Sequence, residues 1–176
     1  MEVISINERQ TQPREATVHH ETTHSDSAGH AGAYTKLWTM SLFSFAAMYV
    51  LMYAMVDALP NVFNSLNQAY MAGLMTAPMV VIEILVMGRM YPKKGLNAAL
   101  MFAALMIGAL CFGLIRVQAG IGDRQFLRSM IPHHAGAILM CDEANLTDPE
   151  IIQLCEGIKS GQQSEIDFMK AKLGAE

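Results

Sequence analysis

The chain has 176 residues, of which 52% are hydrophobic and only 16% are charged. An ordinary soluble domain carries about 25% charged residues, so this composition points away from a purely soluble protein. The formal net charge is −4 at pH 7. Nucleic-acid-binding proteins cluster Lys and Arg on one face, so we expect no nucleic-acid partner.

Residues 1–35 form a polar tail rich in Glu, Thr, Ser and His. Its low hydrophobicity gives it no reason to fold alone, so we expect it to be disordered. The tail contains four histidines, namely His19, His20, His24 and His30. Such His-rich tracts collect metal ions loosely, and a solvated tail without metal is an equal alternative.

The middle of the chain, residues 36–116, contains three apolar stretches, at residues 37–56, 66–87 and 96–115. About 20 apolar residues in a helix are enough to cross the roughly 30 Å of hydrocarbon in a membrane. The first stretch follows a long polar tail, which does not fit a cleavable signal peptide. We therefore predict three transmembrane helices surrounded by membrane lipid, in preference to a water-soluble bundle of apolar helices.

Basic residues in the short loops predict the orientation of these spans. Arg89, Lys93 and Lys94 lie between the second and third spans, whereas the loop at residues 57–67 contains no Lys or Arg. The basic loop should be cytoplasmic, as should the N-terminal tail, whose Lys36 adjoins the first span. The C-terminal region then lies outside, although Arg116, Arg124 and Arg128 count against this orientation.

The second span has residues Met71, Met75, Met79, Glu83 and Met87 at every fourth position, on one helix face. A carboxylate at membrane depth is costly and marks Glu83 as a candidate intramembrane site. Two plainer readings remain open. Methionine is a flexible apolar filler in helix packing, and Glu83 lies near enough to the helix end to reach the headgroups.

The third span has small residues four positions apart. Ala104 precedes Gly108, and Ala109 precedes Gly113. Small residues at this spacing let membrane helices approach closely, so we predict a helix contact there.

Residues 122–174 predict two helices. The first begins with Asp123 as its N-cap and ends near Asn145. The run at residues 147–150, Thr-Asp-Pro-Glu, is a strong start signal for a second helix that reaches about Leu173. So short a connection makes the two helices antiparallel neighbours.

This register places Cys141 level with Cys155, and the imidazoles of His133 and His134 level with Gln162. Gln162 interrupts an apolar helix face and needs a polar partner there. We therefore expect it to orient a histidine. Pro132 removes a helical N–H donor, so we also expect a local kink.

The two helices bring together donors that suit a soft metal ion. Met130, His133, His134, Met140 and Met169 converge in this register. Imidazole and thioether are the ligands of soft or borderline metals, which favours copper among the transition metals. Two adjacent histidines lie about 100° apart around a helix, so they need a distortion or a second subunit to share an ion. Histidines that are simply hydrogen-bonded in a helix interface are the alternative.

The pair Cys141 and Cys155 allows three readings. It is a disulfide of an oxidising compartment, an auxiliary thiolate pair, or two small core residues. The sequence alone does not separate these.

The residues Asp123–Phe126, Met130–His134, Ala137, Met140, Gln162 or Gln163, Glu165, Ile166 and Met169 together form a recognisable pattern. Over residues 122–173 the chain resembles the family called domain of unknown function 305. The resemblance implies a ferritin-like arrangement of helical hairpins, completed here by a dimer or a higher homo-oligomer because the chain holds one hairpin. It also implies a bacterial periplasmic copper protein. The implied ligands are Met130, His133, His134, Met140 and Met169, supported by Gln162 or Glu165.

We therefore expect an all-α membrane protein of the bacterial inner membrane, with a periplasmic C-terminal hairpin that binds, stores or transfers copper. The alternative is an oligomerisation module in which the histidines are structural. The sequence contains neither a nucleophile–base set nor a dinucleotide-binding loop, so we expect no enzymatic activity.

Overall fold

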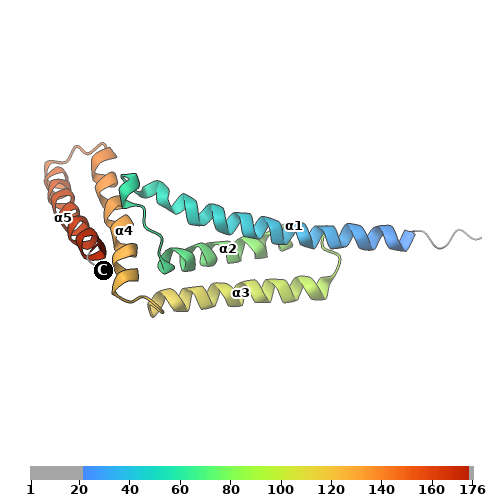
Figure 1. The fold of residues 1–176 in the computed structure, drawn as a ribbon. Helices are drawn as coiled ribbons and strands as arrows, with labels where there is room; N and C mark the ends of the chain where they lie inside the picture. The colour runs from blue at the N-terminus through green and yellow to red at the C-terminus, as the bar shows by residue number, and fades with distance from the viewer. Residues whose placement is uncertain (1–21, 175–176) are drawn as a thin grey trace, which may run out of the picture.

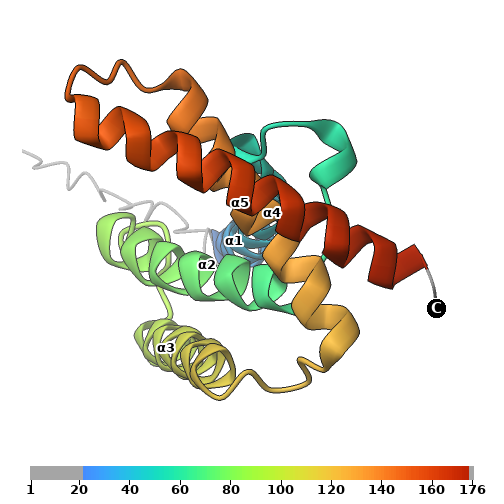
Figure 2. The same ribbon diagram turned by 90° about the vertical axis from the view of Figure 1, so that its left-hand side faces the viewer.

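The computed structural model describes residues 22–174, with side chains from residue 32, and every regular element in this part is helical. The long helices α1 (Thr22–Leu51), α2 (Leu66–Val86) and α3 (Lys94–Arg116) run side by side. Helices α4 (Asp123–Glu143) and α5 (Pro149–Gly174) lie across one end of them (Figures 1 and 2). The predicted all-α class is confirmed.

Helix α1 begins earlier than the sequence suggests, because it includes residues from Thr22 onward that we expected to be disordered. No proline interrupts this stretch, and a helix that has already formed gains one hydrogen bond for each added residue. Two 3-10 turns, η1 (Met52–Met55) and η2 (Leu59–Asn61), then lead towards α2. His19 and His20 lie outside the described residues, as do the side chains of His24 and His30.

Three helical segments are long and apolar enough to cross a membrane, namely Gly32–Met55, Leu66–Val86 and Lys94–Arg116. Large side chains on them point outward, and Phe43 of α1 and Phe102 of α3 are 70% and 66% exposed. Such surfaces need an apolar environment. The protein is therefore membrane-associated, as the sequence predicts.

Helix α2 lies between α1 and α3 and packs closely on α3 through small residues. Ala104 and Gly108 of α3 are buried, and a Cβ atom at Gly108 would lie 3.1 Å from the Cβ of Ala77 on α2. The predicted contact at this pair is confirmed. Ala109 is exposed and Gly113 would meet no atom within 4 Å, so the second predicted pair does not form a contact.

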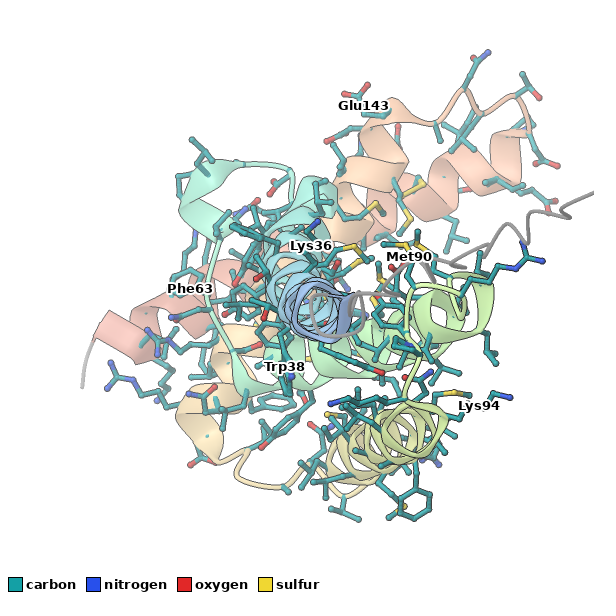
Figure 3. All side chains as sticks on the ribbon, turned by 90° about the vertical axis from the view of Figure 1, so that its right-hand side faces the viewer. Lys36, Trp38, Phe63, Met90, Lys94 and Glu143 are labelled. Atoms are coloured by element: carbon teal, nitrogen blue, oxygen red, sulfur yellow. A yellow bond between two sulfur atoms is a disulfide. The ribbon has the colours of Figure 1, made fainter. Side chains whose placement is uncertain are left out.

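Hydrogen bonds join the three spans at the end that carries the α2–α3 loop. Tyr34 of α1 donates to Oδ1 of Asn97 on α3 over 2.8 Å, and the Asn97 amide donates to the carbonyl of Tyr91 over 2.7 Å. Tyr91 in turn donates to Oε1 of Glu83 over 3.3 Å. Figure 3 looks onto this end, where Lys36 and Lys94 are labelled; we call it the basic end.

At the opposite end of the spans, helix α4 is fixed to the bundle. The Gln125 side chain of α4 accepts a hydrogen bond from the N–H of Leu66, the first residue of α2. Gly136 of α4 comes so close to η1 that a Cβ atom there would lie 3.1 Å from the carbonyl oxygen of Met55. One side of α4, which includes Gln125 and Gly136, therefore contacts the membrane-spanning bundle.

The other side of α4 packs against α5. The shared core contains Ile131, Ala135 and Ile138 of α4 with Ile166 and Met169 of α5, and Val56 and Phe63 pack on its edge. Ile131 and Ile166 are fully buried, and burial of each such side chain stabilises the fold by about 1.5–3 kcal/mol.

The ends of these two helices match the prediction closely. The Asp148 carboxylate accepts hydrogen bonds from the N–H groups of Glu150 and Ile151 at the start of α5, so the predicted start signal is confirmed. At α4 the N-cap is Gly122 and not Asp123. Asp123 is instead the first helical residue, where its charge faces the positive end of the helix dipole. Helix α4 continues through Pro132.

Candidate metal centre

One face of α4 presents an imidazole between two thioethers. At 100° per residue, Met130, His133 and Met140 fall within an arc of about 80° around the helix. His133 is exposed and forms no hydrogen bond with the residues that the structure describes, while Met140 is 55% exposed. The described contact of the His133 ring is with His134, whose ring centroid lies 6.0 Å away. The nitrogen lone pair of His133 is therefore available to a ligand.

His134 is held in the opposite way, because it is buried and both of its ring nitrogens are bonded. Nδ1 lies 2.9 Å from the carbonyl oxygen of Met130, and Nε2 lies 2.6 Å from Oε2 of Glu165 on α5. A carbonyl only accepts, so Nδ1 carries a proton and donates. Nε2 and the Glu165 carboxyl group must then share one further proton, and in this arrangement His134 has no lone pair for a metal.

The partner of His134 is Glu165, which the family resemblance implied as an alternative to the Gln162 that the helix register predicted. Gln162 is half-buried and forms no hydrogen bond with the described residues. Glu165 lies three residues on, which is the neighbouring position on the same helix face. A carboxylate also forms a stronger hydrogen bond to an imidazole than an amide does. The Glu165 side chain is 59% exposed, compared with 9% for His134, so it has room to turn away.

Of the two remaining methionine candidates, Met169 lies in the α4–α5 core and Met130 lies at its edge. Met169 is only 6% exposed and belongs to the α4–α5 core, and Met130 packs against that core while staying half-buried. The five predicted ligands therefore separate into an outward group of His133 and Met140, an inward group of His134 and Met169, and Met130 between them. Among the side chains that the structure describes, at residues 32–174, no three or more His, Cys, Asp or Glu gather in a way that could hold a metal ion.

The cysteine pair forms a disulfide between Cys141 and Cys155, with the two Cα atoms 5.3 Å apart. This bond confirms the predicted register near the turn and selects one of the three readings. Neither sulfur is then a thiolate ligand. Cys111 is a free thiol, half-buried in α3.

Of the methionines in the predicted row of α2, only Met79 lines the same cavity as Glu83. Met71, Met75 and Met87 are exposed, at 39%, 40% and 39%. Met79 and Glu83 instead line a small cavity between α1 and α2, together with Met40 and Ser41 of α1. These α1 residues were not among the predicted site residues, because nothing in the order of the chain shows which face of α1 meets α2.

The fold and this site define a class, namely all-α membrane-associated proteins with a helical pair at their C-terminal end. Residues 112–173 match the family model described as Domain of unknown function (DUF305). A relative in Acanthamoeba polyphaga mimivirus, called Uncharacterized protein L153, is 36% identical over 137 residues, which cover 76% of this chain and 88% of that protein. No solved structure matches the chain. The chain belongs to the DUF305 family.

Proposed function

We propose that this protein is a membrane-anchored metal-binding protein that captures copper on helix α4. The observation that carries the proposal is the open imidazole of His133, flanked on one helix face by the thioethers of Met130 and Met140. Imidazole and thioether together select soft or borderline ions, and Cu(I) fits them best among the transition metals. The proposed function is binding, storage or transfer, without catalysis.

The outward donors of one chain form an incomplete coordination shell, which favours a homo-oligomer. His133 and Met140 project from the α4–α5 pair, and a second copy of the same face would supply matching donors. His134 is a further donor once Glu165 turns away from Nε2. Met169 is left out of this ligand set, because its place in the core is that of a packing residue.

The proposed orientation in the membrane has support from both ends of the bundle. The α2–α3 loop, which contains Arg89 and Lys93, lies at the opposite end of the spans from α4 and α5 (Figure 1). Basic loops stay in the cytoplasm, and disulfides persist in oxidising compartments. We infer that the Cys141–Cys155 bond lies on the extracytoplasmic side, which is the periplasm if the membrane is a bacterial inner membrane. Reporter fusions at each terminus test this inference. A signal from a C-terminal reporter of the kind that works only in the cytoplasm would refute it.

The metal proposal is tested on the full chain purified in detergent. Cu(I) is titrated against a chromogenic chelator, with ascorbate as reductant, for the natural protein, H133A, H133A/H134A and a control. The control is M106L, which removes an exposed thioether from α3. We expect the histidine variants to lose the tight site and M106L to keep it. Unchanged copper binding in H133A/H134A would refute the proposal, and preferential binding of Zn²⁺ would reassign the metal.

A second candidate is an oligomerisation module without a metal, and the outer face of α5 favours it. Leu154 and Phe168 are each 61% exposed there, and their spacing of two heptads places them on the same side of the helix. This candidate predicts an oligomer that survives both chelators and the H133A/H134A changes. Size-exclusion chromatography with light scattering distinguishes it, because a metal-assembled oligomer dissociates under the same treatments.

A further inference from the structure

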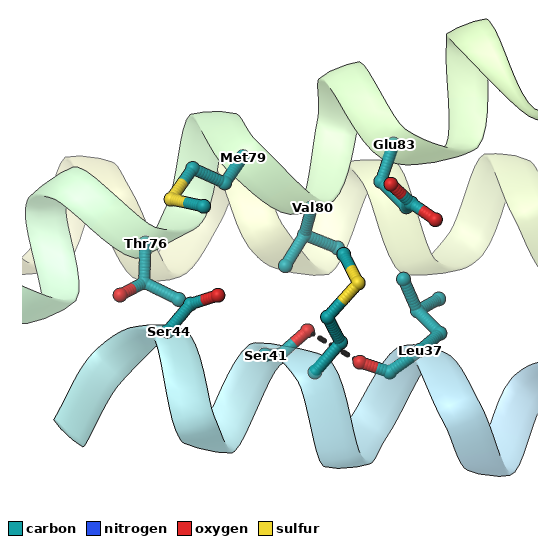
Figure 4. Close-up of a pocket in the computed structure, with 8 residues that line it drawn as sticks. Leu37, Ser41, Ser44, Thr76, Met79, Val80 and Glu83 are labelled. Atoms are coloured by element: carbon teal, nitrogen blue, oxygen red, sulfur yellow. Dashed lines mark hydrogen bonds between the residues drawn. The ribbon is translucent and has the colours of Figure 1, made fainter. Parts of the chain in front are cut away.

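A small, partly open cavity on the membrane-spanning bundle, whose wall includes the 44% exposed Met40, has a lining that suits a cation. It lies between α1 and α2 and has a volume of about 10 Å³, which is room for one water molecule or a small ion. Its polar lining comprises Ser41 and Ser44 of α1 with Thr76 and Glu83 of α2. Figure 4 shows Thr76 pointing from α2 towards Ser44 of α1. Met40, Met79, Leu37 and Val80 complete the wall.

Two of the three hydroxyl groups in this wall, those of Ser41 and Thr76, act as acceptors towards the cavity. Ser41 donates its proton to the carbonyl of Leu37, and Thr76 donates to the carbonyl of Ala72, each over 2.8 Å. Each hydroxyl has a single proton, so its remaining lone pairs are the groups left for a ligand. No lysine, arginine, histidine or amide side chain lines the cavity. Only the Ser44 hydroxyl keeps a proton that no described hydrogen bond uses, so acceptors outnumber donors in this wall and favour a cation.

Glu83 adds a carboxylate to this lining. Its described hydrogen bond is with the neutral hydroxyl of Tyr91, over 3.3 Å, and Glu83 forms no ion pair with the side chains that the structure describes, at residues 32–174. A carboxylate at this depth in a membrane needs a compensating cation or proton. Met40 and Met79 also line this cavity, one from each helix. Hard ions such as Na⁺ prefer a shell of oxygen atoms, whereas two thioethers favour a soft monovalent ion.

We propose that this cavity binds a Cu(I) ion between α1 and α2, with Met40 and Met79 as thioether ligands and Glu83 as the compensating carboxylate. This site is separate from the α4 site, because it lies within the spans and shares no residue with it. The two methionines are long and flexible, so they can close on an ion without moving the helices. The single positive charge of Cu(I) balances the single negative charge of Glu83.

The test uses full-length protein in which the α4 donors are removed by H133A/H134A/M140L, so that this site is read alone. Cu(I) and the redox-stable Ag(I) ion are titrated against a competing chelator in this background and after adding M40L/M79L, E83Q or M75L. M75L is the matched control, because Met75 is exposed on the same helix and lies outside the cavity. We expect one Cu(I) per chain in the background and loss of that ion in M40L/M79L. In E83Q we expect the affinity for Cu(I) to fall by about tenfold or more. M75L should bind as the background does.

X-ray absorption of the Cu(I)-loaded background protein gives a second readout that does not depend on the folding of the variants. Sulfur scattering from two ligands is expected, and a copper shell of nitrogen and oxygen alone would refute the site. Equal loss in M75L and M40L/M79L, or saturable binding of Na⁺ instead of Cu(I), would also overturn it. If binding in this background is intact but H133A/H134A leaves total copper binding of the natural protein unchanged, the α4 proposal fails while this one stands.

Discussion

The close approach of α4 to the membrane-spanning bundle can be tested with two glycines that differ in one respect. Both lie inside long helices, Gly136 in α4 and Gly157 in α5. A Cβ atom at Gly136 would lie 3.1 Å from the main-chain oxygen of Met55 and 3.9 Å from the Met55 Cβ. A Cβ atom at Gly157 would meet nothing within 4 Å. The variants G136A and G157A therefore form a matched pair.

The expected effects on stability have opposite signs. Alanine is favoured over glycine inside a helix by about 1 kcal/mol, so G157A should stabilise the protein by about that amount. At Gly136 the same gain is opposed by contact with a main-chain oxygen, which cannot move aside as a flexible side chain can. Overpacking of this kind costs about 1–3 kcal/mol. We expect G136A to be less stable than G157A by about 1–3 kcal/mol.

Thermal unfolding in mild detergent, followed by far-UV circular dichroism, measures the difference. G157A should unfold at a higher temperature than the natural protein, and G136A at the same or a lower one. If G136A were stabilised as much as G157A, the reasoning would be refuted, because Gly136 of α4 could not then lie against the carbonyl of Met55.

Two further predictions concern the disulfide and the basic end. The Cys141–Cys155 bond links residues 14 apart, and closing a loop of this length stabilises a fold by about 3 kcal/mol; C141S/C155S should therefore unfold earlier, and a reductant should lower the unfolding temperature of the natural protein but not of this variant. An equal effect of the reductant on both would contradict the prediction. Burial raises the pKa of Tyr91 above its ordinary value of 10.0, and the nearby Glu83 carboxylate raises it further. Tyr91 thus keeps its proton longer in the folded protein than in the unfolded chain, so its contribution to stability is complete below pH 10 and is lost as the pH rises through the folded pKa. Unfolding measured between pH 8 and about 11 should show a smaller alkaline loss in Y91F than in the natural protein, and identical slopes would refute this assignment.

Much of the fold was predictable because its signals are local. The second and third spans were predicted at residues 66–87 and 96–115, and the helices occupy Leu66–Val86 and Lys94–Arg116. Lengths of apolar chain set these limits, and Asp148 with Pro149 sets the start of α5 by an equally local signal. The extension of α1 into residues 22–35 was less accessible, because this polar stretch contains no strong start or stop signal.

The sequence by itself determined the number, type and limits of most helices and the membrane association, and it supplied the candidate metal ligands near His133. The tertiary structure decided which of these side chains meet. It paired His134 with Glu165 instead of Gln162, turned Met169 into the core, joined Cys141 to Cys155, and placed Met40 and Ser41 beside Glu83. The physical reason is that helical periodicity gives the face of a residue on its own helix, whereas contacts depend on how neighbouring helices are rotated and offset against one another. Packing of the whole molecule sets those rotations.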